Sequence, residues 1–536
     1  MSFDTAAIKN NIIAHEKEGF VYTYGTAGFR SNAEVLGSVM YKVGILAALR
    51  SKKLNSSTIG DNGVKLVDPR GEMLEQSWEV YATKLANAND GETLLNAIDE
   101  IVAQYKIDLE IPANVIYAYD TRPSCPHLVK CLEQGLEAAG AKGTNFGLKT
   151  TPMLHYLVRC INTAGTNDAY GEPTEEGYYK KLTTAFATAK GKPRLSTLHV
   201  DCANGVGAPK LRELLKFISP NTLSVDIVNE DTTTLGQLNK NCGADFVKTN
   251  QRAPPSITIT AGDRCCSFDG DADRIVFYYV TEDGTFRLLD GDKIAGLAAI
   301  FITELVQEAG IDSIKVGVVQ TAYANGSSTN YLTKVLSVPV SCVSTGVKHL
   351  HHEAEKYDVG VYFEANGHGT VLFSPDALNT IKTAEAKTPA QKQAIAQLSA
   401  LTELINQTVG DAISDMLLVE AILTSRQWSF EEWDQAYTDL PNRLVKVVVS
   451  DRHIFKTTNA ERQLVEPAGL QAEIDSLVAK YSNALCLLIV YLYSASGTED
   501  AVRVYAEAAT RAETDDLAFK VAQLVYDRAG GVGARP

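Results

Sequence analysis

Three features are missing from this sequence of 536 residues, and each absence argues against a class of protein. Charged residues interrupt the first 30 positions, so we find no apolar segment of a secretory signal there. The longest strongly apolar run, Ala484–Tyr493, has about half the length needed to cross a bilayer. Positive charge is in deficit, and a net charge of −15 disfavours nucleic-acid and anionic-membrane partners. We therefore expect a cytoplasmic protein that binds neither nucleic acid nor membrane.

The nine cysteines are odd in number and lack the paired spacing of a metal site. This usage fits a reducing compartment better than a disulfide framework. The composition is otherwise that of a globular protein, with 45% hydrophobic and 21% charged residues. The length corresponds to roughly three or four domains of ~100–200 residues each.

The first two-thirds of the chain repeats one theme, a strand followed by a helix. The predicted strands include Val115–Tyr119, Lys315–Val319 and Val359–Phe363. The predicted helices include Pro126–Ala139 and Lys293–Ala309, each followed by a glycine. Such alternation implies sheets with helices packed on them, and hence an α/β protein.

Domain boundaries are predicted from changes in this pattern. Polar, weakly patterned stretches at Asn162–Glu176 and Pro375–Gln391 separate the units, and after Pro441 helices and strands mix in an α+β manner. We predict three similar mixed-sheet α/β domains at 1–165, 166–290 and 291–435, and a smaller C-terminal α+β domain at 436–536. The identity between the three similar units is too low to establish a repeat.

A cluster of acidic residues carries the clearest chemical signal. Asp269, Asp271 and Asp273 alternate with glycine and alanine, and Arg274 follows them. In an extended segment such residues share one face, so three carboxylates would converge on one point that suits a hard divalent cation. An EF-hand is excluded, because Arg274 stands where its glycine is required and Val280 where its glutamate is required. A solvated acidic turn remains the alternative, disfavoured by the apolar strands on both sides.

Other polar loops follow predicted strands, where open α/β sheets bind ligands. Glu364–Thr370 combines a carboxylate, an amide and an imidazole, which suit sugar hydroxyls, although a polar hairpin turn is equally compatible. Lys348 lies shortly before this loop and could face the same ligand. His349, His351 and His352 lack the spacing of a zinc motif, and we interpret them as a solvated helix face.

Three further loops suit anions. Tyr24–Arg30 offers glycines and the fixed charge of Arg30, and Asp61–Lys65 ends a tight turn with Lys65. Ser494–Thr498, followed by Arg503 on a predicted strand, resembles a phosphate cradle. Each of these three is also compatible with an ordinary turn. The cradle consists of Ser494, Ala495, Ser496, Gly497 and Thr498.

Together these motifs resemble the α-D-phosphohexomutase superfamily, and within it the phosphoacetylglucosamine mutases. The resemblance runs through nearly the whole chain, and Asn366 favours this branch over relatives acting on glucose or mannose phosphates, which have serine there. The matching segments are Gly25–Arg30, Asp61–Met73, Asp201–Leu211, Cys242–Thr249, Asp269–Arg274, Glu364–Thr370 and Ser496–Thr498 with Arg503.

The resemblance implies four domains around a central cleft and a sugar-phosphate substrate, and we expect a monomer. It implies reversible conversion of N-acetylglucosamine 6-phosphate to the 1-phosphate through an enzyme phosphoserine, for UDP-N-acetylglucosamine synthesis. The aspartate cluster would bind Mg²⁺, and Arg30 and Lys65 would add positive charge. The substrate would be bound by the phosphate cradle with Arg503, and by the remaining residues Arg274, Lys348, Glu364, Ala365, Asn366 and His368.

The chain departs from the family at two points. The family's phosphoserine loop reads T-A-S-H-N-P shortly before D-N-G-V-K, whereas here Thr58-Ile59-Gly60 runs directly into Asp61, with about eleven residues fewer. Ser494 stands where the family has arginine. Both departures are abrupt and flanked by close matches, a pattern more typical of mis-joined exons than of gradual drift. Two hypotheses therefore stand: a phosphoacetylglucosamine mutase, or an inactive relative that binds sugar phosphate. A phosphoglucomutase or phosphomannomutase is the weaker third.

Overall fold

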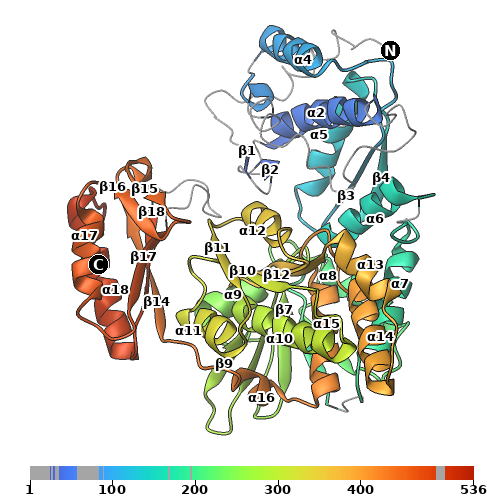
Figure 1. Ribbon diagram of the computed structural model, residues 1–536. Coiled ribbons are helices and arrows are strands. Elements are labelled where there is room, and N and C mark those ends of the chain that lie inside the picture. Colours follow the sequence, from blue (N-terminus) through green and yellow to red (C-terminus); the bar gives the residue numbers. More distant parts are fainter. Residues whose placement is uncertain are drawn as a thin grey trace. The chain divides into compact units, whose positions relative to one another are not determined.

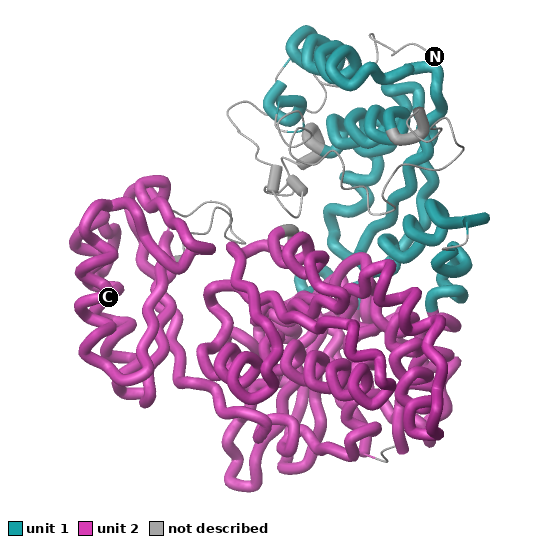
Figure 2. The backbone as a smooth tube through the Cα atoms, in the orientation of Figure 1, with its two compact units in different colours: residues 1–178, 232–238 teal, residues 179–231, 239–536 magenta. Residues whose placement is uncertain are grey.

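The computed structural model describes residues 36–56, 82, 84–88, 90–166, 169–192, 196–489 and 501–536, together with Tyr24–Gly25 and Gly28–Phe29. The chain divides into two compact units, residues 1–178 with 232–238 and residues 179–231 with 239–536 (Figure 2). No helix among the described residues is long and apolar enough to cross a membrane. All nine cysteines are described, and all are free.

The first unit packs helices around a parallel pair of strands (Figure 1). A two-residue antiparallel pair, β1 (Tyr24–Gly25) and β2 (Gly28–Phe29), precedes them. The main elements are α2 (Leu36–Ser56), α4 (Gly91–Tyr105), β3 (Val115–Tyr119), α5 (Cys125–Ala138), β4 (Gly143–Leu148), α6 (Thr151–Thr163) and the start of α7 (Glu175–Ala189).

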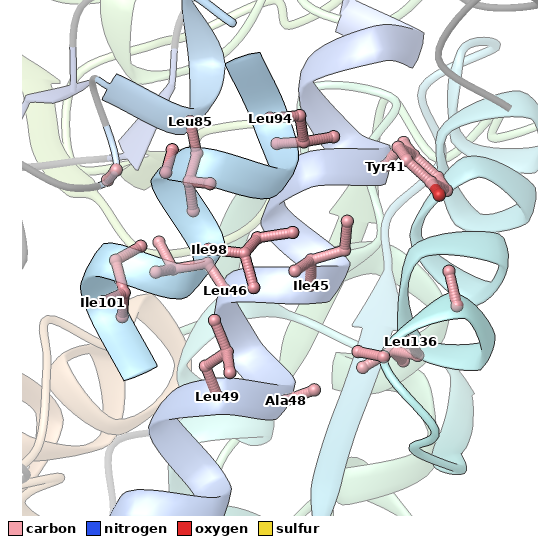
Figure 3. Close-up of a cluster of buried hydrophobic side chains, with 14 of the residues drawn as sticks. Tyr41, Ile45, Leu46, Ala48, Leu49, Leu85, Leu94, Ile98, Ile101 and Leu136 are labelled. Atoms are coloured by element: carbon pink, nitrogen blue, oxygen red, sulfur yellow. The ribbon is translucent and has the colours of Figure 1, made fainter. Parts of the chain in front are cut away.

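The core of this unit forms where α2 meets α4 and α5. Ile45 and Leu49 of α2 and Leu94 and Ile98 of α4 are buried there (Figure 3). Helix α2 crosses α5 closely, because a Cβ on Gly135 would lie only 1.9 Å from a carbonyl oxygen of α2. Glycine is therefore required at this crossing, since no side chain fits between the two backbones.

The second unit contains two mixed sheets of one topology. Their strand orders are β6-β5-β7-β8-β9 and β11-β10-β12-β13. In each sheet the first strand along the chain pairs in parallel with the next two, and the third pairs antiparallel with the fourth. Two of the three units predicted to be similar therefore share a strand order, whereas the β3–β4 sheet described in the first unit has two strands. The strands are β5 (Leu198–Asp201), β6 (Val225–Val228), β7 (Arg264–Phe268), β8 (Ile275–Val280), β9 (Phe286–Leu289), β10 (Val316–Thr321), β11 (Val340–Val343), β12 (Val359–Phe363) and β13 (Gly369–Phe373).

Helices cover these sheets. Helix α10 (Gly291–Ala309) packs against β10, β12, α14 and α15, begins at the Asp290 cap and ends at Gly310, which has a left-handed φ of +69°. The other helices are α8 (Gly207–Leu215), α9 (Ala244–Asn250), α11 (Gly326–Asn330), α12 (Val347–Ala354), α13 (Pro375–Thr383), α14 (Pro389–Leu404), α15 (Ala412–Arg426) and α16 (Phe430–Asp434), with a π-helical turn at Tyr331–Val335.

The C-terminal part of this unit has an antiparallel sheet of order β14-β18-β17 with two helices on it. A separate hairpin joins β15 to β16. The elements are β14 (Asn442–Val448), a 3-10 turn at Arg452–Ile454, β15 (Lys456–Thr458), β16 (Gln463–Glu466), α17 (Leu470–Val478), β17 (Leu485–Ile489), β18 (Ala501–Glu507) and α18 (Arg511–Arg528).

The mixed α/β class predicted from the sequence is confirmed, and the strands at Val115–Tyr119 and Val359–Phe363 have the predicted bounds. The prediction of an unpatterned linker at Pro375–Gln391 is wrong, because α13 and α14 begin there. Ser374 and Thr388 cap these helices, and each is followed by a proline in the first turn. The mostly polar, partly exposed residues at the start of these helices made the stretch look like a linker.

Candidate functional site

The aspartate cluster forms the connection between β7 and β8. One carboxylate oxygen from each of Asp269, Asp271 and Asp273 lies within 4.8 Å of the others, a group that could hold a metal ion. The route to this arrangement differs from the one expected, because the segment is a tight turn and not an extended strand. Ala272 adopts a left-handed φ of +56°, which folds the chain back so that the carboxylates meet.

The carboxylate of Asp269 holds this turn together. Its Oδ1 accepts the backbone N–H groups of Asp273 at 3.1 Å and Arg274 at 3.2 Å, and its Oδ2 accepts Nε of Arg274 at 3.0 Å. Asp269 is buried, whereas Asp271 and Asp273 are half-buried. One aspartate therefore fixes the turn, while the other two stay closer to solvent.

Arg274 bridges the turn to a neighbouring helix. Besides Asp269 it contacts Asp273 at 3.6 Å, and it pairs with Asp245 of α9. No local pattern in the sequence marks Asp245, although this residue lies within the Cys242–Thr249 segment that matches the family. The arginine offsets part of the negative charge of the cluster.

The electrostatics of the turn are those of crowded carboxylates. Burial raises the pKa of Asp269 well above its usual range, and repulsion from Asp273 and Asp271 raises it further. Burial also raises the pKa of Asp273, but hydrogen bonding to His368 and the charges of His368 and Arg274 lower it to about 2. Asp269 therefore holds a proton more readily than Asp273, and a bound divalent cation would compete with that proton.

The second loop, between β12 and β13, is a polar turn closed by its own backbone. The Glu364 N–H donates to the His368 carbonyl at 2.8 Å, and the Gly367 N–H donates to the Glu364 carbonyl at 2.8 Å. Oε2 of Glu364 accepts a hydrogen bond from Nδ2 of Asn366 at 3.3 Å, and Oε1 accepts one from the backbone N–H of Gly346 at 3.3 Å. The carboxylate and the amide are thus held side by side.

The structure brings these two loops into direct contact. The N–H of Ile275 donates to the carbonyl of Gly367 at 3.2 Å, and Nδ1 of His368 lies 3.4 Å from Oδ2 of Asp273. A Cβ on Gly367, whose φ is +87°, would lie 1.9 Å from the carbonyl oxygen of Ile275, so glycine is needed for the approach. Burial lowers the pKa of His368, but Asp273 more than compensates and the net pKa is raised.

A third turn supports the aspartate cluster from behind. It follows β5, and the N–H of Val206 donates to the carbonyl of Gly270 at 3.1 Å. A Cβ on Gly205 would lie 2.3 Å from that carbonyl oxygen. The buried Asp201 ties the turn together by accepting hydrogen bonds from Asn229, Ser267 and the N–H groups of Ala203 and Gly243. In the sequence, only the family resemblance of Asp201–Leu211 pointed to this glycine-rich segment.

Several predicted site residues lie outside the described part of the chain. They are Arg30, Lys65 with the adjoining Gly60–Asp61 junction, the side chain of Lys348, and the phosphate cradle from Ser494 to Thr498. Arg503 is described, half-buried in β18 between β14 and β17. Ala365 lies in the polar turn after β12.

The three histidines near α12 lie in different environments. His349 is exposed, as expected for a solvated helix face. His351 is not, because its Nδ1 lies 3.1 Å from the hydroxyl of Tyr362 in the adjacent sheet. The prediction of one solvated face is therefore wrong for His351.

Comparisons with known proteins support one family along most of the chain. Residues 83–180 match the family described as "Phosphoglucomutase/phosphomannomutase, alpha/beta/alpha domain I". Residues 168–276 and 290–428 match "Phosphoacetylglucosamine mutase AMG1", domain II and domain III respectively.

Individual relatives match over nearly the full length. The phosphoacetylglucosamine mutase of Sus scrofa is 50% identical, with 99% of each chain covered. A solved structure of the Aspergillus fumigatus N-acetylphosphoglucosamine mutase is 54% identical, with a TM-score of 0.91 and 99% of each chain covered. A second structure of that enzyme, in complex with GlcNAc-6P and magnesium, has a TM-score of 0.89 at 54% identity, covering 98% of this chain and 99% of the other.

Proposed function

The chain belongs to the phosphoacetylglucosamine mutase family, and on that premise we propose that its site interconverts N-acetylglucosamine 6-phosphate and N-acetylglucosamine 1-phosphate. By family it is a phosphohexomutase, an isomerase that moves a phosphoryl group. The observation that supports the proposal is the contact between the aspartate turn and the Glu364–Gly367 turn, which would bring a bound cation beside a bound sugar.

Mg²⁺ fits the donor set of the aspartate turn. Asp269, Asp271 and Asp273 supply only carboxylate oxygens, which this hard cation prefers, and the two half-buried members leave room for water or phosphate oxygens. Burial and the charges of Asp273 and Asp271 raise the pKa of Asp269, and a bound cation would offset the repulsion between these carboxylates. When bound, Mg²⁺ would neutralise charge on the transferring phosphoryl group. The related Aspergillus fumigatus enzyme has been solved with magnesium.

The residues of this chain would bind and orient the sugar phosphate. Glu364 and Asn366 present a carboxylate and an amide that suit the sugar hydroxyls, and Ala365 adds the backbone between them. His368 carries a raised pKa and would offer a proton-bearing imidazole beside Asp273. Arg274 would add a positive charge next to the reacting phosphate.

The remaining predicted contacts belong to the same proposal. Lys348 would approach the substrate from the start of α12. Ser494–Thr498 and Arg503 would hold the phosphate that does not react, and Arg30 and Lys65 would add charge at the reacting one. We propose that these residues belong to four domains, with bounds 1–165, 166–290, 291–435 and 436–536, and that each domain contributes to the site.

We further propose that the chain as written turns over slowly, because its sequence passes from Gly60 to Asp61 without the T-A-S-H-N-P serine loop. Loss of a covalent nucleophile costs on the order of 10⁴–10⁶ in rate in well-studied triad enzymes. This departure also favours the second candidate function, a sugar-phosphate-binding relative without mutase activity. The two candidates share the binding site and differ only in turnover.

Titration calorimetry on the full chain tests the shared binding site. With Mg²⁺ present, N-acetylglucosamine 6-phosphate should bind more tightly than glucose 6-phosphate, and Glu364→Ala should weaken binding about tenfold or more. Asn366→Ser should reduce the preference for the acetylated sugar. Equal binding of both sugar phosphates by the wild type and by Asn366→Ser would contradict the assignment of the substrate.

A further inference from the structure

The turn between β15 and β16 has an unusual backbone. Asn459, Ala460 and Glu461 are consecutive, and all three have left-handed φ values, of 52°, 54° and 67°. For residues other than glycine the left-handed conformation is unfavourable, although asparagine tolerates it better. A run of three without glycine persists only where other contacts hold it, so the contacts of this turn call for an explanation.

Those contacts converge on the carboxylate of Glu461. Its Oε2 accepts three hydrogen bonds. The donors are the hydroxyl of Tyr323 at 2.8 Å, the hydroxyl of Thr345 at 2.8 Å and the backbone N–H of Thr345 at 3.1 Å. Tyr323 follows β10 and Thr345 precedes α12, so both donors belong to the four-stranded sheet domain. Hydrogen bonds to an ionised acceptor are stronger than neutral ones. The left-handed turn therefore presents one carboxylate to three donors of another domain.

Contacts other than those of Glu461 also attach the C-terminal domain. Glu507 at the end of β18 accepts the N–H of Gly326 at 3.1–3.2 Å, and Asn325 exchanges two hydrogen bonds of 3.0 Å with the backbone of Leu440. A small apolar cluster that includes Tyr323, Leu487 and Tyr505 adds to this attachment. The contacts of the Glu461 carboxylate therefore bear more specifically on the Thr345–Gly346 segment.

The residue after Thr345 connects Glu461 to the polar turn that follows β12. Gly346 directly follows Thr345, and its N–H donates to Oε1 of Glu364 at 3.3 Å. Gly346 has a φ of 123°, a conformation that residues with a side chain rarely adopt, so glycine suits this position. The same short segment is held by Glu461 on one side and holds Glu364 on the other.

We propose that Glu461 is a positioning residue that orients Glu364 through the Thr345–Gly346 backbone. The proposal rests on the proposed role of Glu364 in holding the sugar. A binding carboxylate must be held within a fraction of an ångström, and its own hydrogen-bond partners provide that constraint. A residue of the C-terminal domain thereby sets the geometry of a sugar-binding loop more than ninety positions earlier in the chain.

The test compares Glu461→Ala with Glu461→Gln, whose amide oxygen can still accept hydrogen bonds. Binding of N-acetylglucosamine 6-phosphate with Mg²⁺ is measured by titration calorimetry, and amide hydrogen exchange is followed at Thr345 and Gly346. We expect Glu461→Ala to weaken binding about tenfold and to accelerate exchange at both amides. Glu461→Gln should weaken binding only about twofold. Glu466→Ala is the matched control, because Glu466 lies in the same hairpin and its one ion pair among the described residues is an exposed pair with Lys456.

A second variant distinguishes loss of the hydrogen bonds to Glu461 from unfolding of the hairpin. Tyr323→Phe removes one donor without touching the turn, and we expect it to weaken binding about threefold in the wild type and not at all when combined with Glu461→Ala. Wild-type affinity and exchange rates in Glu461→Ala, or an equal loss in Glu466→Ala, would overturn the proposal. If the wild type binds no sugar phosphate, the proposed function fails instead, and the exchange rates at Thr345 and Gly346 still decide whether Glu461 orders this segment.

Discussion

Replacing Asp271 with asparagine should make the metal-free protein more stable while removing its response to Mg²⁺. The three carboxylate oxygens lie within 4.8 Å of one another. At that distance two unit charges repel by about 3.5 kcal/mol at an effective dielectric constant of about 20. Arg274 and solvent reduce this repulsion, so we expect the substitution to stabilise the metal-free protein by about 1–3 kcal/mol. A gain of that size corresponds to roughly 2–12 °C in the melting temperature for domains of about 150–250 residues.

Thermal denaturation with and without Mg²⁺ measures both effects. A ligand at a hundred times its dissociation constant stabilises the folded state by about 2.7 kcal/mol, so the wild type should gain markedly on addition of metal and Asp271→Asn should gain little. Asp312→Asn, an exposed aspartate in the same unit, is the control and should behave as the wild type in both conditions. If Asp271→Asn were less stable than the wild type without metal and showed the full metal-dependent gain, these carboxylates would not form a cation site.

Three further predictions concern stability. Gly135→Val should destabilise the first unit by several kcal/mol, because its Cβ would lie 1.9 Å from a carbonyl oxygen, and the melting temperature checks this. Glu420→Ala should cost about 3–5 kcal/mol in chemical denaturation, since it leaves Arg264 buried without its partner, now 2.7 Å away. Burial and the charge of Asp290 raise the pKa of Asp439 from 3.8 to about 7, so the folded state holds the extra proton and stability should fall as pH rises from about 4 to about 7. Asp439→Asn should flatten that fall in melting temperature measured across pH, and an unchanged slope would contradict the assignment.

The sequence predicted the parts of this protein that depend on local pattern. Strand Val359–Phe363 has its predicted bounds because a continuous apolar run is bounded by polar residues, and α10 ends where Gly310 permits a left-handed turn. The clustering of Asp269, Asp271 and Asp273 followed from their spacing, although the turn that brings them together depends on Ala272, whose left-handed backbone no composition rule indicates.

Local sequence patterns could not predict the long-range contacts. Nothing in the local pattern around Glu461 indicates that its carboxylate meets Tyr323 and Thr345, because those donors lie more than a hundred residues earlier. The contact of Ile275 with Gly367 is equally non-local, and the family resemblance, not the residues themselves, suggested that the two loops share a site. The duplicated sheet topology could not be seen in the sequence for a related reason. Two sheets can share a strand order with different residues, because the order requires a pattern of buried strands and not particular residue types.

Phosphorus NMR during incubation with N-acetylglucosamine 6-phosphate, Mg²⁺ and a trace of sugar bisphosphate tests the central claim most directly. The measurement is made on the chain as written and on a version with T-A-S-H-N-P restored in a loop between Gly60 and Asp61. The restored protein should form N-acetylglucosamine 1-phosphate until equilibrium, and the chain as written should form it slower by several orders of magnitude. Equal rates would show that the nucleophile lies elsewhere, and the absence of product from the restored protein would contradict the assignment of a mutase site.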